Sequence, residues 1–236
     1  MKIFKIAILV LLATVAGSVQ SRATPFLDLY GGTASFGDVK TTQTGVGDNN
    51  NTKILNSYIF GLRAGSITQG DLLSFAIAFD NSFYRVNAAR SEKTNNTALD
   101  TTYTDDMQGG LVWQPGVQVI AGVPLRHVRL YAGAGLIMPI VMYNYTAYDP
   151  TTDNAPYSTS GMSATLGGQF LFGGRWLITK KLNLFVEDRV QKIFSPLAIK
   201  NSYGDTNNMV FHDETFTFQD LNSNQIVFGM GYAWGN

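Results

Sequence analysis

The stretch that decides the fold is IVFGMGYAW, residues 226–234. Large apolar side chains alternate there with small ones, and a period of two is the pattern of a β-strand with two different faces. The large side chains that share one face belong to Ile226, Phe228, Met230, Tyr232 and Trp234. The stretch therefore predicts a strand with one bulky apolar face and one nearly bare face.

Seven segments upstream show the same alternation. They are residues 26–36, 58–65, 73–83, 109–122, 128–136, 161–176 and 182–190. With residues 226–234 they make eight predicted strands, an even number. No stretch after the N-terminal segment supplies the roughly 20 uninterrupted apolar residues that a membrane-spanning helix needs.

The connections between these strands alternate in length. Short ones lie near residues 66–71, 124–127 and 178–181, and long polar ones near residues 37–52, 87–108, 146–160 and 200–224. The four long loops hold 4 basic and 12 acidic residues, so most of the acidic residues lie at one end of the predicted strands. Short periplasmic turns and long outer loops are typical of a bacterial outer-membrane barrel. Closure also pairs every backbone group inside the lipid, which an open sheet does not do.

Composition narrows the class further. Charged residues make up 14% of the chain, the formal net charge is zero and there is no cysteine. A nucleic-acid-binding protein needs a basic face, and a chain without cysteine has neither disulfides nor thiolate metal sites. We therefore predict an all-β protein, an eight-stranded antiparallel transmembrane β-barrel with four long extracellular loops. Ten strands are the alternative if a long loop hides a hairpin.

The first 23 residues are predicted to be a secretory signal peptide. Lys2 and Lys5 precede an apolar run over residues 6–16, and small and polar residues follow as far as Ala23. This is the order of regions in a cleaved export signal, and the apolar run is too short to span a membrane. Cleavage leaves residues 24–236 as the barrel domain, located in the bacterial outer membrane.

With the apolar faces outward, the polar faces line the lumen. An eight-stranded barrel is just wide enough for side chains to fill. The charged residues of the predicted lumen network are Asp28, Arg63, Asp80, Arg129, Arg175, Glu187 and Arg189, and its other polar members are Gln114, Gln118, Tyr131, Gln169 and Gln191. Because an unpaired buried charge is unfavourable, we expect these charges to pair into a plug. A gated polar channel is the alternative.

Two residues fit this arrangement poorly. Asp188 falls on the outward face, where an acid in the middle of a membrane is unfavourable. Pro115 lies within a predicted strand and lacks the backbone donor of a ladder, which predicts a bulge there.

Candidates for enzymatic chemistry are few. The histidines are His127, at a predicted turn, and His212, in the last long loop. The run His212-Asp213-Glu214, together with Asp105-Asp106 in the second loop, offers a base and carboxylates for a protease at the barrel mouth. These acids and Asp100 could also attract divalent cations diffusely, although no loop has EF-hand spacing. Solvated acidic loops are the simpler interpretation, and no catalytic residue, bound metal or cofactor is predicted.

The whole of residues 24–236 resembles the small outer-membrane β-barrel superfamily that includes the OmpA and OmpX barrels and opacity-like surface proteins. The matching motifs are Phe185-Val186-Glu187-Asp188-Arg189, similar to the aromatic-x-Glu-x-Arg strand of that family, and the C-terminal strand from Val227 to Trp234. The resemblance implies that Glu187 and Arg189 join a polar lumen network. It also implies an insertion strand, with Phe228, Met230, Tyr232 and Trp234, that is read by the barrel assembly machinery.

The function expected from these features is that of a non-enzymatic, structural or envelope surface protein. Its partners would be outer-membrane lipid, lipopolysaccharide, the assembly machinery and a host or envelope ligand at the acidic loops, because binding usually resides in loops on a rigid scaffold. A narrow channel for ions or small solutes, through the Arg and Glu residues of the lumen, is the main alternative. A lipid-modifying or proteolytic barrel enzyme centred on His212 is a third.

Overall fold

The computed structural model describes residues 23–43, 49–70, 72–89, 91–96, 101–106, 110–149, 154–205, 210–219 and 221–234. Within these residues the chain forms strands β1 to β16, joined by turns and short connections, and every pairing between strands is antiparallel. No helix in this part of the chain is long and apolar enough to cross a membrane. The predicted signal peptide lies outside the described residues, apart from Ala23.

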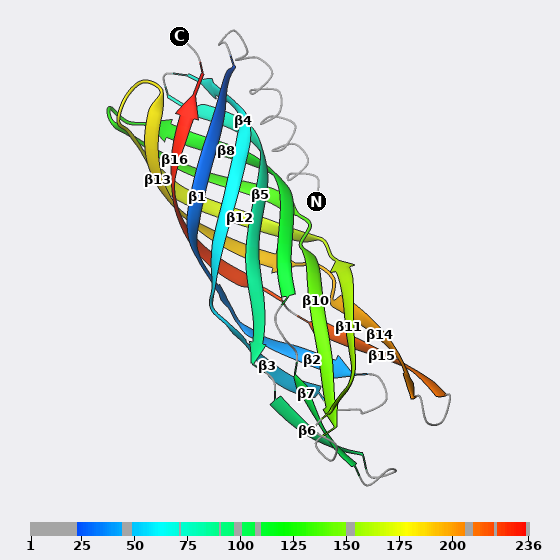
Figure 1. Ribbon diagram of the computed structural model, residues 1–236. Coiled ribbons are helices and arrows are strands. Elements are labelled where there is room, and N and C mark those ends of the chain that lie inside the picture. Colours follow the sequence, from blue (N-terminus) through cyan, green and yellow to red (C-terminus); the bar gives the residue numbers. More distant parts are fainter. Residues whose placement is uncertain are drawn as a thin grey trace, which may run out of the picture.

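Eight of the strands close into a barrel (Figure 1). They are β1 (Thr24–Phe36), β4 (Ser57–Gln69), β5 (Ser74–Ala89), β8 (Gly110–Pro124), β9 (Val128–Ile137), β12 (Gly167–Leu177), β13 (Leu182–Ile193) and β16 (Ser223–Ala233). Each strand pairs with the next in this order, and β16 pairs back with β1. The predicted eight-stranded antiparallel barrel is therefore confirmed.

The strands are strongly tilted, and their register shows by how much. The path of directly paired residues that starts at Phe26 of β1 runs once around the barrel and returns to β1 at Phe36. This shift of ten residues over eight strands corresponds to a tilt of about 40° from the barrel axis. The residues directly above and below one another along the axis are therefore diagonal neighbours on adjacent strands.

The other eight strands form hairpins beyond one end of the barrel, which we call the hairpin end (Figure 1). They are β2 (Asp38–Gln43), β3 (Asn49–Leu55), β6 (Ser91–Asn96), β7 (Thr101–Asp106), β10 (Ile140–Asp149), β11 (Asn154–Ala164), β14 (Leu197–Asp205) and β15 (Val210–Gln219). All four predicted long loops thus contain a hairpin. None of the hairpins enters the barrel circuit, so the alternative of ten barrel strands is wrong.

The hairpins are joined to one another and to the barrel by strand pairing. β15 pairs with β2, β3 with β5, and β10 with both β8 and β7. The opposite end of the barrel, which we call the turn end, has short connections, and Phe26 of β1 pairs there with Ala233 of β16. The long and short connections therefore lie at opposite ends, as their lengths predict.

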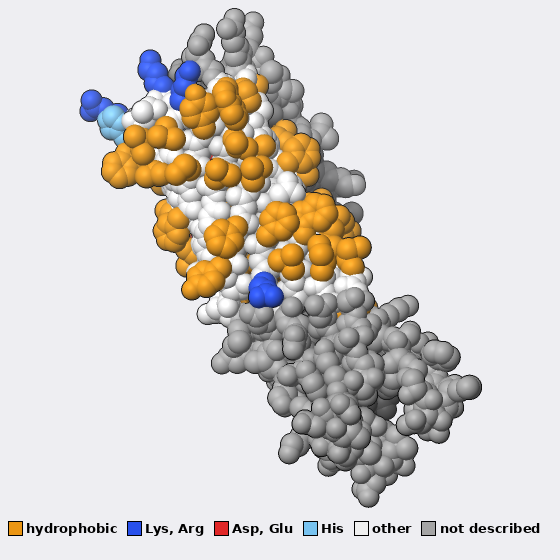
Figure 2. Space-filling model, viewed as in Figure 1, with side chains coloured by type: hydrophobic (Ala, Val, Ile, Leu, Met, Phe, Trp, Pro, Cys, Tyr) orange, Lys and Arg blue, Asp and Glu red, His pale blue; other side chains and the backbone are white. Residues whose placement is uncertain are grey.

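Burial alternates along the barrel strands. In β13 the residues exposed on the outer surface alternate with buried residues that point inward, and Asp188 lies on the outer face as its position in the alternation predicts. Figure 2 shows apolar side chains spread over the outer wall of the barrel on the face in view, with most of the visible Lys, Arg and His side chains near the turn end and one basic side chain at the opposite edge. The outer surface is thus apolar while charged groups occupy the interior, the reverse of a water-soluble protein.

Two expectations about single segments are wrong. The predicted strand over residues 161–176 is interrupted at Thr165 and Leu166, where the Thr165 hydroxyl donates a hydrogen bond to the Ser195 carbonyl oxygen at 2.9 Å. Residues 161–164 therefore belong to the hairpin strand β11, and β12 begins at Gly167.

Pro115 does not produce the expected bulge. The register between β5 and β8 is unbroken through the pair Asn81 and Pro115. On its other side Pro115 faces the break between β9 and β10, where the Met138 amide donates to the Pro115 carbonyl oxygen at 2.9 Å. A residue without an amide donor is tolerated at this point because the ladder is already interrupted there.

Candidate functional site

Six charged side chains inside the barrel form one continuous chain of alternating sign. In order they are Arg175, Asp28, Arg63, Glu187, Arg189 and Asp80. They project inward from β12, β1, β4, β13 and β5, so the chain crosses the lumen from wall to wall. Three arginines and three carboxylates balance exactly in charge, and we call this set the lumen chain.

The first link is Asp28, which binds two arginines. Arg175 donates to both of its carboxylate oxygens, from Nη1 to Oδ1 at 3.0 Å and from Nη2 to Oδ2 at 2.7 Å. Arg63 donates from Nε to Oδ2 at 3.0 Å. The two-pronged contact from Arg175 is the strong geometry for a guanidinium and a carboxylate. Asp28 is fully buried, and these donors satisfy both of its oxygens.

Glu187 is the centre of the chain. Arg63 donates from Nη1 to its Oε2 at 2.8 Å, and Arg189 donates from Nε to its Oε1 at 2.5 Å. The side chains of all three residues are completely inaccessible to solvent. Glu187 thus bridges two buried arginines, and each of them also binds an aspartate, Arg63 to Asp28 and Arg189 to Asp80, so no charge of the three is left unpaired.

Asp80 ends the chain on β5. Arg189 donates from Nη1 to Asp80 Oδ2 at 2.8 Å, and the Tyr30 hydroxyl donates to Oδ1 at 2.5 Å. Gln118 adds a third donor, its amide Nε2. Arg189 also lies over the Tyr30 ring, with 4.2 Å between the guanidinium carbon and the ring centroid, a cation–π contact. Tyr30 thus holds both partners of the last ion pair.

The bare face of β16 leaves room for these large side chains. A Cβ atom at Gly231 would lie 2.2 Å from Asp28 Oδ1, and one at Gly229 would lie 2.5 Å from the Phe185 ring. A Cβ at Gly61 on β4 would overlap the Tyr30 ring in the same way, at 2.2 Å. The small residues that alternate with bulky ones in the sequence are therefore required by the lumen side chains opposite them.

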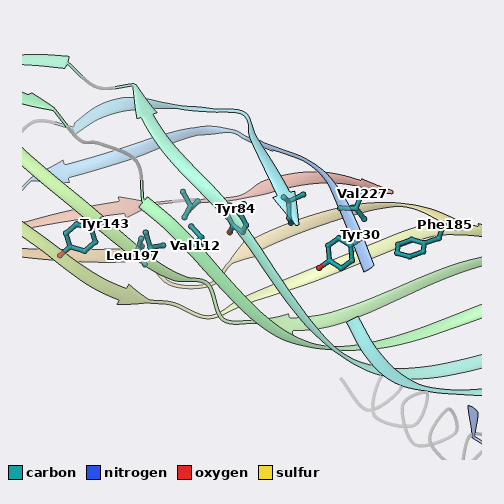
Figure 3. Close-up of a cluster of buried hydrophobic side chains, with 10 residues drawn as sticks. Tyr30, Tyr84, Val112, Tyr143, Phe185, Leu197 and Val227 are labelled. Carbon is teal, nitrogen blue, oxygen red and sulfur yellow. The ribbon is translucent and has the colours of Figure 1, made fainter. Parts of the chain in front are cut away.

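Apolar side chains pack around the lumen chain in two clusters. One comprises Phe26, Ala76, Ala78, Ile120, Tyr131 and Leu171. Toward the hairpin end a second cluster extends past the barrel, as Figure 3 shows for the series from Phe185 through Tyr30 and Tyr84 to Leu197 and Tyr143. The last two belong to the hairpin strands β14 and β10. Within the described residues, the charged chain is therefore packed among apolar side chains.

The structure brings six of the seven predicted charged lumen residues into the lumen chain. The seventh, Arg129, points inward beside Arg175 on the neighbouring strand, and its Nε is buried without a hydrogen-bond partner among the described residues. The predicted glutamines also point inward. Gln191 donates to Gln169 at 2.7 Å, and Tyr84 donates to Gln114 at 3.0 Å.

Sequence reasoning missed several lumen residues, and Tyr30 and Gln225 are two of them. Tyr30 was not expected in the network although it lies two residues after Asp28 on the same face of β1, which is the signal that would have found it. Gln225 is also fully buried, and neither polar atom of its side chain has a partner within the described part of the chain. It directly precedes the alternating stretch of β16, and its place in the alternation directs its side chain into the lumen.

The other candidates lie outside the lumen. His212-Asp213-Glu214 belongs to β15, which pairs with β14 and β2, whereas Asp105 and Asp106 belong to β7, which pairs with β6 and β10. Their side chains, like those of Asp100, lie outside the described side chains. Where side chains are described, no three His, Cys, Asp or Glu residues gather as a metal site would require. The insertion-strand residues Phe228, Met230, Tyr232 and Trp234 all face outward.

The fold and the lumen together define a class of protein. A closed barrel with an apolar outer wall, a charged interior and hairpins at one end is the architecture of a small outer-membrane β-barrel. The resemblance seen in the sequence is borne out at this level. Within the lumen each carboxylate of the described residues is held by arginine, so the arrangement binds the walls of the barrel together.

Solved structures with a similar fold are outer-membrane proteins. Neisserial surface protein A is 14% identical over 88% of this chain and 96% of its own, with a TM-score of 0.44. A major outer membrane protein from Thermus thermophilus is 13% identical over 88% and 99%, with a TM-score of 0.49. The Escherichia coli outer membrane protease OmpT is 9% identical over 91% and 98%, with a TM-score of 0.47. No protein-family model and no curated protein sequence matches the chain.

Proposed function

We propose that the protein is a non-enzymatic surface protein of the outer membrane, which binds its partner through the acidic hairpins while its lumen stays closed. The observation that carries the proposal is the lumen chain. Its six charges pair across the barrel, with side chains no more than 10% exposed, and apolar clusters pack around them. A lumen filled in this way makes the barrel a rigid scaffold. The hairpins are then the surface that is left for binding.

The form of the hairpins supports a binding role. Pairing of β15 with β2 and of β3 with β5 makes a continuous sheet out of segments from different connections. A sheet of this kind presents its residues with less conformational entropy to lose on binding than irregular loops would. The four long connections carry 12 acidic and 4 basic residues, so a cationic partner surface is favoured. We place the hairpins outside the cell and the short turns in the periplasm.

Trimming the hairpins tests the proposal. In β14–β15, Asn201 pairs with Glu214, and replacing residues 202–213 by Asn-Gly joins this pair through a two-residue turn. The same replacement of residues 92–105 joins Ser91 to Asp106. The probe is polylysine, added to neutral phosphatidylcholine vesicles that contain either the full chain or the doubly trimmed chain. We expect salt-sensitive binding by the full chain and at least a tenfold weaker binding by the trimmed chain.

The control for this experiment is a double substitution that removes charge and leaves the hairpin lengths unchanged. Asp213→Asn with Glu214→Gln should weaken polylysine binding by a smaller factor than trimming does. If the doubly trimmed barrel binds polylysine as strongly as the full chain, the hairpins are not the binding surface and the proposal is wrong.

A further inference from the structure

Asp188 occupies an unusual place on the outer wall. It lies near the middle of β13, six residues after Leu182 and five before Ile193, and its side chain faces outward. The residues on the same face of the strand, Val186 and Val190, are apolar and 45% exposed. Asp188 therefore lies at the centre of the apolar belt that faces lipid.

No other acid of the described barrel strands is in this situation. Asp28, Asp80 and Glu187 all point inward and are bound by arginines. The side chain of Asp188 has no hydrogen bond or ion pair within the described part of the chain. A polar group without a partner is unfavourable in hydrocarbon, and ionisable residues at this depth nearly always pair or face protein. The position calls for a hydrogen-bond partner on another molecule.

The surroundings of Asp188 have a definite shape. Because the strands tilt by about 40°, its neighbours along the barrel axis are diagonal, Gly174 toward the turn end and Asn224 toward the hairpin end. The other two diagonal neighbours, Phe170 and Phe228, lie to either side at similar depth and are 69% and 61% exposed. Asp188 thus lies in a narrow strip of small or polar residues between two projecting aromatic rings.

We propose that this face is the interface of a homodimer, in which the Asp188 carboxyl groups of two copies hydrogen-bond to each other. Two copies inserted in the same direction are related by a two-fold axis along the membrane normal, and this axis keeps every residue at its own depth. Asp188 then meets Asp188 of the second copy, and a protonated carboxyl donates to the oxygen of the other.

The same rotation makes the flanking residues complementary. The ring of Phe170 meets Phe228 of the second copy, and Phe228 meets Phe170, so two aromatic pairs enclose the carboxyl pair. Gly174 has no side chain to hold the two walls apart. A partner of different sequence would have to supply both a hydrogen-bond donor at this depth and a matching strip, whereas a second copy supplies them by symmetry.

The absence of cysteine allows a direct test by cross-linking. Gly174→Cys places a thiol on the proposed axis, and the structure accommodates it because a Cβ there meets no atom nearer than Leu130 Cδ2 at 3.7 Å. The matched control is Ala64→Cys, another small outward residue, on β4, which lies four strands away and so on the opposite wall. Both variants are oxidised in outer membranes with copper phenanthroline and run on non-reducing gels, with folding checked by heat-modifiable mobility.

We expect a disulfide-linked dimer from Gly174→Cys and at least fivefold less from Ala64→Cys. Adding Asp188→Leu to Gly174→Cys should lower the dimer yield to the control level, since leucine needs no partner in lipid, and adding Asp188→Asn should preserve it. Equal yields from the two walls, or no dimer from a folded Gly174→Cys barrel, would overturn the proposal. So would an adduct of Gly174→Cys with a different protein in place of the dimer.

Discussion

Glu187 is the residue on which the lumen chain depends most. It contacts Arg63 and Arg189 at once, and all three side chains are inaccessible to solvent. Glu187→Gln leaves one negative charge too few for the buried arginines, and we expect the free energy of unfolding to fall by about 3–5 kcal/mol. Urea titration of the refolded barrel, followed by the mobility of folded and unfolded bands, measures the change.

The control for this variant is Lys192→Gln, which removes a charge from the exposed face of the same strand. Substitution of an exposed residue away from such networks should alter stability by no more than about 0.5 kcal/mol. Equal effects of the two substitutions would show that the lumen chain does not stabilise the barrel.

Glycine positions give a second test at the scale of single residues. Gly61→Ala forces a methyl group into the Tyr30 ring, whose hydroxyl is already fixed by Asp80 and Arg189, and overpacking of this kind costs about 1–3 kcal/mol. Gly174→Ala adds the same methyl group on the outer face, 3.7 Å from the nearest atom. Measured by the same titration, Gly174→Ala should be close to wild type, and a Gly61→Ala barrel of unchanged stability would contradict the packing described for Tyr30.

The sequence predicts which residues face the lumen but not which of them meet. The period of two assigns Asp28, Arg175 and Glu187 to inward faces without any knowledge of register. Arg175 and Asp28 are 147 residues apart, and their contact depends on the ten-residue shift around the barrel, which alternation within single strands does not reveal. Tyr30 was overlooked for a related reason, because an aromatic residue on a polar face looks neutral until its partner Asp80 is placed beside it.

At the scale of elements, the hairpins are the feature that alternation failed to predict. Residues 200–224 and the other long connections are rich in Asn, Thr, Asp and Gly, which are typical of turns, and so they were predicted as loops. In the structure strand pairing continues beyond the barrel, from β5 to β3 and from β8 to β10. Pairing with a strand that is already ordered extends a polar segment that has little strand preference of its own.

The hairpins and the barrel should nevertheless be separable. The circuit of eight strands closes without them, and every ion pair of the lumen chain among the described residues joins barrel strands. We expect the chain with residues 92–105 and 202–213 each replaced by Asn-Gly to refold in detergent with the heat-modifiable mobility of a closed barrel. Failure of the doubly trimmed chain to refold would mean that hairpin pairing is needed for closure.

At the scale of the whole molecule, the barrel is a filled cylinder with an apolar outside. Its interior holds a neutral chain of six charges packed among two apolar clusters, so no continuous aqueous path follows from the described residues. The low charge content and the alternating pattern of the sequence predicted a membrane barrel, since a wall in contact with lipid needs both. They did not distinguish a plug from a channel, because the same arginines and carboxylates serve either until their pairing is known.

The conductance of the folded barrel is the measurement that tests this account most directly. Residues 24–236 are refolded, checked by heat-modifiable mobility and inserted into a planar bilayer, beside a porin of known conductance as the positive control. The closed lumen predicts a silent membrane for the wild-type barrel. Discrete, reproducible openings that change in size with Glu187→Gln would show that ions pass along the lumen chain, and the account of a plugged scaffold with binding hairpins would be contradicted.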